Sequence, residues 1–417
     1  MPEARPDSPP AETAARPTRL RSLDAMRGLV IAAMLLVNMT WDRDSLPAQL
    51  FHVPWNTPAQ GATFTDLVFP WFIFIAGAAA PLSLRSGRGR GMTGRRIVSA
   101  AAVRAFKLYL LGVLLTVASF ATERPLVWSD LLSWNILQLL GAAYFFVVLA
   151  QLAPPRWRVA IIVGLLAAKW ATFLLPYETV ASLATLRPAE GAPTGPGTWA
   201  HFDGVKQLLH MEHVPLPTFA SLVVGWFGMA QQYLPLATIG MVGALATERI
   251  ERGRDTRSAM TIAAWGVALV VVGALLQWGY DPAGGGLWGV ATVPYSKWLF
   301  SPAYCLLAAG TGALLLAAMF AAVDVAGLTG FGLLQSLGKN ALAVYVGAEL
   351  SFKLIVSRWL LPLPDGAADS IAGAIQAWIR YATGSAVAAS LGWALLWVAV
   401  WMLVAVRLDR RGLYWRV

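Results

Sequence analysis

The chain has 417 residues, of which 57% are hydrophobic and only 13% are charged, and its mean hydropathy is +0.60. Such an apolar composition excludes an ordinary soluble domain and predicts an integral membrane protein, with the lipid bilayer as a partner. The net charge of +10 does not indicate a nucleic-acid-binding protein, because the basic residues are shared among short alternate connections instead of one soluble face.

Residues 1–18 come first and are predicted to form a disordered cytoplasmic tail, because they are rich in Pro, Ala and Glu. Residues 19–417 are expected to form a single transmembrane domain. Apolar runs of roughly 20 residues, enough to cross about 30 Å of hydrocarbon, recur along it. The runs are continuous, which favours an all-α bundle of about ten helices over a β-barrel. The predicted spans are 23–41, 64–84, 98–120, 134–152, 159–176, 234–249, 260–279, 303–323, 338–357 and 386–406.

Basic residues cluster in every second connection, for example between the second and third spans and after the last one. The positive-inside rule makes that side cytoplasmic and places both termini there. The composition favours a bacterial inner membrane. On the other side we expect the loop 42–63 and an extracytoplasmic segment at about 177–233, which is too long to be structureless and is predicted to cover the outer mouth.

Two polar residues flank the first outer loop. Asn38 lies fifteen residues beyond Leu23, which is about 22 Å along a helix and near the outer boundary of the bilayer. His52 lies on the short polar loop that follows. A carboxamide and an imidazole that converge there would suit acyl transfer, with Asn38 as oxyanion or orienting partner and His52 as general base. The alternatives are an interhelical hydrogen bond for Asn38 and a plain loop histidine.

The second span begins with Asp66 and contains Pro70. Proline has no amide hydrogen, so Pro70 should release the carbonyl of Asp66 and kink the helix. Asp66 either caps the helix together with Thr65 or orients His52. In the first span, Asp24 and Arg27 are three residues apart and are expected to form an ion pair on one helix face.

Several of these segments together resemble the heparan-α-glucosaminide N-acetyltransferase family and its bacterial relatives. The likeness covers almost the full chain, and its most specific part is the first eighty residues. The matching segments are 20–28, Val37-Asn38, His52 with Trp55 and residues 65–77, 136–138 with Gly141 and Tyr144, Lys297-Trp298 with Tyr304, 323–325, 338–341 with Tyr345-Val346, and 410–415.

The resemblance implies an enzyme that takes acetyl-CoA as co-substrate from the cytoplasmic face and acetylates the amine of an extracytoplasmic glucosamine. No metal is expected, because the chain has a single cysteine and His210 and His213 have no third ligand in register. His52 matches the catalytic histidine of the family and Asn38 its asparagine partner, while Asp66, Trp55 and Asn340 match further motif positions. Sugar binding is expected from four residues, two in the resembling segments and two that are rough counterparts in the faintly similar segment 177–233. They are Trp55, Asp203, His213 and Lys297.

Coenzyme A carries several phosphates that cannot enter hydrocarbon, whereas its thin pantetheine arm can. The phosphates would require cations near the cytoplasmic mouth. The candidate residues for binding the co-substrate, which include Asn340 from the family motif, are Arg27, Arg85, Arg95, Arg96, Arg104, Lys107 and Asn340. The alternative is that the arginines only set the topology.

Other functions stay open at this point. An acyltransferase that modifies hydroxyl groups of an envelope glycan would use the same residues, and a secondary transporter of amino sugars or a noncatalytic scaffold would share the architecture. A transporter is disfavoured because the chain has no evident internal repeat. The sequence does not decide whether the protein forms a homodimer.

Overall fold

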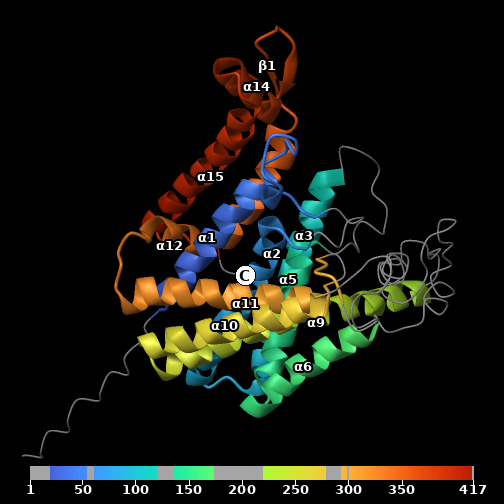
Figure 1. Ribbon diagram of the computed structural model, residues 1–417, viewed down its shortest axis with the longest axis vertical. Helices are drawn as coiled ribbons and strands as arrows, with labels where there is room; N and C mark the ends of the chain where they lie inside the picture. Colours follow the sequence, from blue (N-terminus) through green and yellow to red (C-terminus); the bar gives the residue numbers. More distant parts are fainter. Residues whose placement is uncertain are drawn as a thin grey trace, which may run out of the picture.

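The computed structural model describes residues 19–53, 61–120, 135–172, 219–278, 293–297 and 300–415 (Figure 1). Within these ranges the protein is α-helical, apart from one small hairpin and a few short turns. The α-helices of the first half are α1 (Arg21–Asn38), α2 (Phe64–Gly89), α3 (Gly94–Phe120), α5 (Ile136–Ala150) and α6 (Pro155–Thr172). Those of the second half are α9 (Phe219–Arg252), α10 (Thr256–Gln277), α11 (Pro302–Met319), α12 (Gly332–Lys339), α13 (Ala341–Ser351), α14 (Ile371–Thr383) and α15 (Ala386–Arg410).

A helix occupies each of the ten predicted ranges, so the prediction of an all-α polytopic membrane protein is confirmed. Five helical segments of the described chain are long and apolar enough to cross a membrane, and α5 is apolar but shorter. The five are Phe64–Gly89, Gly94–Phe120, Thr256–Gln277, Pro302–Val325 and Ala386–Arg410. The fourth includes a π-helical turn, η4 (Phe320–Val325), which follows α11 directly.

Two predicted spans have the wrong boundaries. The sixth was expected to be short and to start near residue 234, but α9 starts at Phe219 and continues through Pro235. In the sequence, Gln231 and Gln232 interrupt the apolar run and conceal the helix before them. The ninth span was expected to be continuous, but it divides at Asn340 into α12 and α13 and ends in the π-helical turn η5 (Phe352–Val356).

The connection 358–385 carries secondary structure of its own. Strands β1 (Leu360–Pro362) and β2 (Ala368–Ser370) pair in antiparallel register, and the helix α14 follows them directly. Ser370 caps α14 through its side chain, and Gly384 ends the helix in the left-handed conformation. Figure 1 shows this unit at the end of α15 that lies away from α12.

Glycines allow three pairs of helices to approach closely. A Cβ on Gly28 of α1 would lie 1.8 Å from the carbonyl oxygen of Leu334 in α12, and one on Gly77 of α2 would lie 2.0 Å from that of Gly240 in α9. Gly266 and Gly310 bring α10 against α11 in the same way. Contacts between small residues are the usual means of helix association in lipid, where burial of apolar surface gives little driving force.

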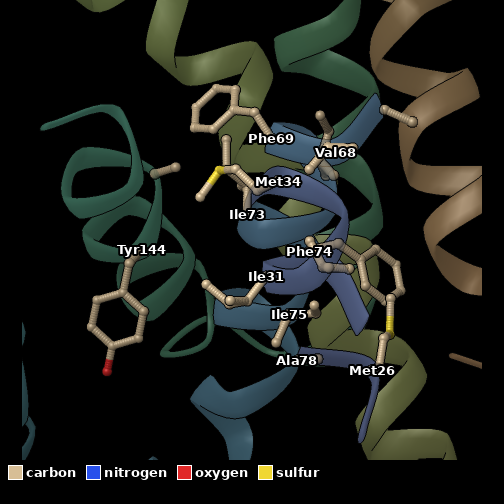
Figure 2. Packing of buried hydrophobic residues seen from close by; sticks show 14 of the residues in the cluster. Met26, Ile31, Met34, Val68, Phe69, Ile73, Phe74, Ile75, Ala78 and Tyr144 are labelled. Atoms are coloured by element: carbon tan, nitrogen blue, oxygen red, sulfur yellow. The ribbon is translucent and has the colours of Figure 1, made fainter. Parts of the chain in front are cut away.

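The core fills the space between these contacts with large side chains. Met34, Phe69 and Ile73 lie among the buried residues where α1 meets α2 (Figure 2), and all three are less than a tenth exposed. Tyr144 of α5 extends away from this cluster in the same view. Its surroundings become important below.

Ion pairs bring several basic connections to one end of the bundle. Arg85 near the end of α2 pairs with Glu251 near the end of α9, and Arg158 at the start of α6 pairs with Glu248. Asp324 in η4 accepts from the backbone amide of Ser22 at 3.0 Å. We call this end of the bundle the arginine-rich face. It carries the starts of α1 and α6, the α2–α3 connection, and the ends of α9, η4 and α15. The opposite face carries the loop with His52.

Substitution of Gly28 by Ala is expected to destabilise the protein. The added methyl group would clash with the backbone of α12 and force α1 and α12 apart, at a cost of about 1–3 kcal/mol. Thermal unfolding in detergent should show a lower midpoint for Gly28→Ala. Gly164→Ala in α6, where an added Cβ meets nothing within 4 Å, is the matched control and should keep the wild-type midpoint. Equal midpoints for both variants would contradict the close contact.

Candidate functional site

The start of α2 holds a buried carboxylate. Thr63 is the N-cap, and Asp66 three residues later completes a capping box in which each side chain bonds the backbone amide of the other residue. Asp66 is only 2% exposed, and its Oδ2 also accepts from the Thr63 hydroxyl at 3.0 Å and from the amide of Val53 at 3.3 Å. The capping role predicted for Asp66 is confirmed, but its partner is Thr63 and not Thr65, because the helix begins at Phe64.

Pro70 lies inside α2, and it leaves a backbone acceptor free as predicted. It has no amide hydrogen to donate to the carbonyl oxygen of Asp66, one turn earlier. The hydroxyl of Tyr304, which is buried near the start of α11, donates to this oxygen at 2.6 Å. The tyrosine therefore satisfies a buried acceptor that the proline leaves open, and it fixes α11 to the first turn of α2.

His52 is held by this carboxylate. Its Nδ1 lies 2.8 Å from Oδ1 of Asp66, whose other oxygen is occupied by Thr63 and Val53. An ionised carboxylate only accepts, so we assign the proton to Nδ1, which leaves the lone pair of Nε2 available. The His52 side chain is 39% exposed, so a substrate can reach it. A histidine with one nitrogen oriented by a buried acid and the other accessible has the geometry of a general base.

Lys297 completes the group. Its Nζ is 3.1 Å from both ring nitrogens of His52. A lysine on the lone-pair axis of either nitrogen would be much farther from the other one, so Nζ lies over the face of the imidazole and not on the lone-pair axis of Nε2. Burial lowers the pKa of Lys297 to about 8, against the opposing attraction of Asp66. The site thus contains an amine that titrates near neutral pH.

Asn38 lies at the end of α1 and is exposed. Its amide donates to Oε1 of Glu349 in α13 at 3.3 Å, and Lys353, one turn further along, approaches the same carboxylate at 3.7 Å. The interhelical hydrogen bond considered for Asn38 is therefore present. Within the part of the chain that the structure describes, no hydrogen bond joins Asn38 to His52, and its role as an oxyanion donor stays a prediction.

A cavity of about 680 Å³ lies between α1, α2, α3, α5 and the α12–α13 pair. Along α2 it extends from Arg90 at the arginine-rich face to Phe72, a helical distance of roughly 27 Å. Phe72 is only six residues from Asp66, or about 9 Å along the helix. The middle of the cavity is apolar and is lined by Ile31 and Ile75, among others.

The arginine-rich end of this cavity is cationic. Arg27, Arg90, Arg104 and Lys339 all line it, and among the described lining residues there is no Asp or Glu. Arg104 lies over the ring of Tyr144 at 4.7 Å, which holds its guanidinium at the cavity wall. Arg27 forms the predicted ion pair with Asp24, at 3.3 Å. A cationic opening on an apolar passage is suited to a ligand with an anionic head and a neutral tail.

The other predicted residues are distributed as follows. Lys107 lines a smaller cavity of about 230 Å³ that also contacts Arg90 and Arg104. Arg85 pairs with Glu251, and Arg95 and Arg96 are exposed at the start of α3. Buried Asn340 donates to the carbonyl oxygens of Ser336 and Ala405, and so braces the break between α12 and α13. The residues Trp55, Asp203 and His213 lie outside the described residues.

The structure also brings residues into the site to which sequence reasoning gave no role. Tyr304 and Lys339 lie in segments that resemble the family. This resemblance marked both residues, but it did not indicate what they contact. Arg90 had no signal beyond its place in a basic connection. Its position in the cavity depends on where α2 ends and on how α2 faces α5.

Comparison with known proteins agrees with the resemblance noted in the sequence. The model of the family described as "Heparan-alpha-glucosaminide N-acetyltransferase, catalytic" matches residues 19–189. The chain is 26% identical to heparan-alpha-glucosaminide N-acetyltransferase of Homo sapiens over 97% of its own length, and 25% identical to that of Mus musculus over 96%. It spans about 60% of the length of each relative. The predicted relationship to this family is thereby confirmed.

The loss of stability caused by removing the Tyr304 hydroxyl is expected to depend on whether residue 70 is proline. Tyr304→Phe leaves the buried carbonyl of Asp66 without a donor, which costs about 1–3 kcal/mol. Pro70→Ala restores an amide hydrogen one turn away, so the same substitution should cost much less in that background. Thermal midpoints of the wild type, both single variants and the double variant give the coupling. Equal losses in the two backgrounds would show that the hydroxyl does not serve this carbonyl.

Proposed function

We propose that this chain, a relative of the heparan-α-glucosaminide N-acetyltransferases, is a membrane-embedded acetyltransferase that moves acetyl from acetyl-CoA to the amine of a glucosamine-type sugar. One observation carries the proposal: a cavity that is cationic at the arginine-rich face and apolar further in extends toward the face that bears His52. We further propose that the arginine-rich face is cytoplasmic and the His52 face extracytoplasmic, in a bacterial inner membrane.

The cavity fits the two halves of the donor. The phosphates would remain at Arg27, Arg90, Arg104 and Lys339, where guanidinium and ammonium groups replace their hydration. The pantetheine arm would lie along the apolar part of the passage. The whole cavity is roughly 27 Å long, which is comparable with the thickness of the hydrocarbon. Only the acetyl group has to reach the far side, so no charge crosses the membrane.

His52 would act as the base. The nitrogen of the sugar attacks the thioester carbonyl carbon, and Nε2 of His52 takes the proton that the nitrogen loses. Asp66 keeps the other proton on Nδ1 and stabilises the imidazolium that forms. When the tetrahedral intermediate collapses, the carbon–sulfur bond breaks, the amide is formed, and the imidazolium returns its proton to the sulfur of CoA. An acceptor hydroxyl would react by the same steps.

Lys297 would act on the oxygen of the intermediate. Its ammonium lies 3.1 Å from Nε2, on the ring face, where it can donate to the negative oxygen that develops as the nitrogen attacks. Asn38 remains the second candidate donor. This assigns Lys297 to the reaction itself, whereas the sequence suggested contact with the sugar.

The function is tested by incubating the purified protein in detergent with labelled acetyl-CoA and glucosamine. Labelled N-acetylglucosamine is the expected product, and transfer by His52→Ala should be about 10²–10⁴-fold slower because the proton acceptor is lost. The variant should stay folded and keep its affinity for CoA, with a lower thermal midpoint because buried Asp66 loses one of its partners. Full transfer by a folded His52→Ala protein would remove His52 from the mechanism.

The choice of acceptor separates the remaining functions. Galactose and glucose, which offer hydroxyls but no amine, should stay unlabelled if the enzyme is an N-acetyltransferase. Labelling of such hydroxyls would identify an O-acyltransferase. Accumulation of glucosamine inside vesicles without consumption of acetyl-CoA would instead identify a transporter.

The pH dependence of the transfer rate should reflect the protonation state of Lys297. Because its pKa is about 8, the ammonium is present below that pH and is lost as the pH rises through it, so transfer should decline on the alkaline side. Lys297→Arg keeps a positive charge at every accessible pH and should retain activity above pH 8, although its planar head will lower the maximum rate. Lys297→Met should be slow throughout.

The readout is the ratio of wild-type to Lys297→Arg rates between pH 6 and 10 with the same acceptor. Ionisation of the acceptor amine affects both proteins equally and cancels in this ratio. The ratio should fall through about pH 8. A constant ratio would show that another group controls the alkaline decline.

A further inference from the structure

The end of α15 turns back on itself. Gly412 has a φ of 67°, in the left-handed region, and its amide donates to the carbonyl oxygen of Asp409 at 3.0 Å, while the amide of Leu413 donates to that of Leu408 at 3.0 Å. These two bonds form a Schellman motif, which ends a helix and reverses the chain. The residues that follow, Tyr414 and Trp415, are thereby directed back along the helix end.

Asp409 fixes this reversed segment to α12. Its carboxylate accepts from the hydroxyl of Tyr414 at 2.6 Å, from the hydroxyl of Ser336 at 2.6 Å and from Nζ of Lys339 at 3.0 Å. The side chain of Asp409 is only 15% exposed, so these charge-assisted bonds are protected from solvent. One carboxylate therefore sets the positions of the C-terminal segment and of a cation at the cavity opening.

The result is an aromatic ring beside a group of cations. Trp415 lines the large cavity together with Lys339, Arg27, Arg90 and Arg104. It is 46% exposed, so a flat indole surface remains available at the opening. Aromatic faces bind nucleobases by stacking, and cations bind the phosphates attached to them. An exposed indole next to four cations is thus a surface suited to a nucleotide with several phosphates.

We propose that the segment Asp409–Trp415 forms the nucleotide site of the cavity, with Trp415 stacked on the adenine of CoA and Lys339, oriented by Asp409, bound to a phosphate. The inference rests on the proposed function, since it names where the head of the proposed donor binds. It assigns a role to Trp415, Lys339, Asp409 and Tyr414 in selecting a nucleotide-bearing thioester over a simpler one.

The test compares ligands with and without the nucleotide. Affinity for CoA is measured by calorimetric titration of the full-length protein in detergent. The Trp415→Ala variant should bind CoA on the order of tenfold more weakly than the wild type does. Trp415→Phe, which keeps a smaller ring, should lose much less. Acetyl transfer from acetyl-pantetheine, which lacks the nucleotide, should proceed at the same rate in Trp415→Ala and wild type.

Trp157→Ala is the matched control, because Trp157 is 56% exposed, lies at the start of α6 near the arginine-rich face, and does not line the cavity. Its affinity for CoA should equal that of the wild type. The nucleotide site is wrong if Trp415→Ala binds CoA as tightly as the wild type. It is also wrong if this variant loses acetyl-pantetheine transfer to the same extent as affinity for CoA. Neither result would contradict the proposed transferase activity. If the wild type binds no CoA, both the site and the proposed donor are wrong.

Discussion

Asp66 is buried at the first turn of α2, and a carboxylate in that position is stable only if every lone pair has a partner. The backbone and side chain of Thr63, the amide of Val53 and the ring of His52 supply those partners. The start of the helix, the course of the loop before it and the orientation of the imidazole are consequently set by a single group. A neutral isostere at this position would loosen all three together, because the imidazole bonds one oxygen of this carboxylate while the cap and the loop bond the other.

The cavity depends on a different kind of constraint. Its walls include α1, α2 and the α12–α13 pair, and glycines hold these walls at two contacts where backbones touch: Gly28 and Gly338 between α1 and α12, and Gly77 between α2 and α9. Helices locked at such contacts cannot move together to fill a neighbouring space. An apolar passage can then persist inside a bundle whose remaining core, around Phe69 and Ile73, is closely packed.

The sequence predicted what depends on local geometry. The ion pair of Asp24 with Arg27 follows from helical spacing, and the freed carbonyl of Asp66 follows from Pro70. It could not predict that Tyr304 would fill that carbonyl or that Lys297 would reach His52, since these residues are 238 and 245 positions away from their partners. In lipid, both the outside and the interior of a bundle are apolar, so the periodicity of a span does not reveal which face meets its neighbours. The break at Asn340 was missed for the same reason, because hydrogen bonds to Ser336 and to Ala405 of α15 stabilise it.

In the proposed reaction, one end of the molecule binds the donor and the other end carries out the proton transfer. At the arginine-rich face, fixed positive charge would hold the nucleotide of the proposed donor, and Asp409 restrains Lys339 with a carboxylate that is 70 residues away in sequence. At the opposite face, the groups are an imidazole oriented by a buried carboxylate and an amine whose pKa is lowered to about 8. Arginine could not replace the imidazole as the base, because it does not release its proton, and histidine would be a poor phosphate anchor, because it loses its charge. The placement of basic residue types at the two ends of the molecule therefore suits the proposed reaction, which would bind an anion at one end and transfer a proton at the other.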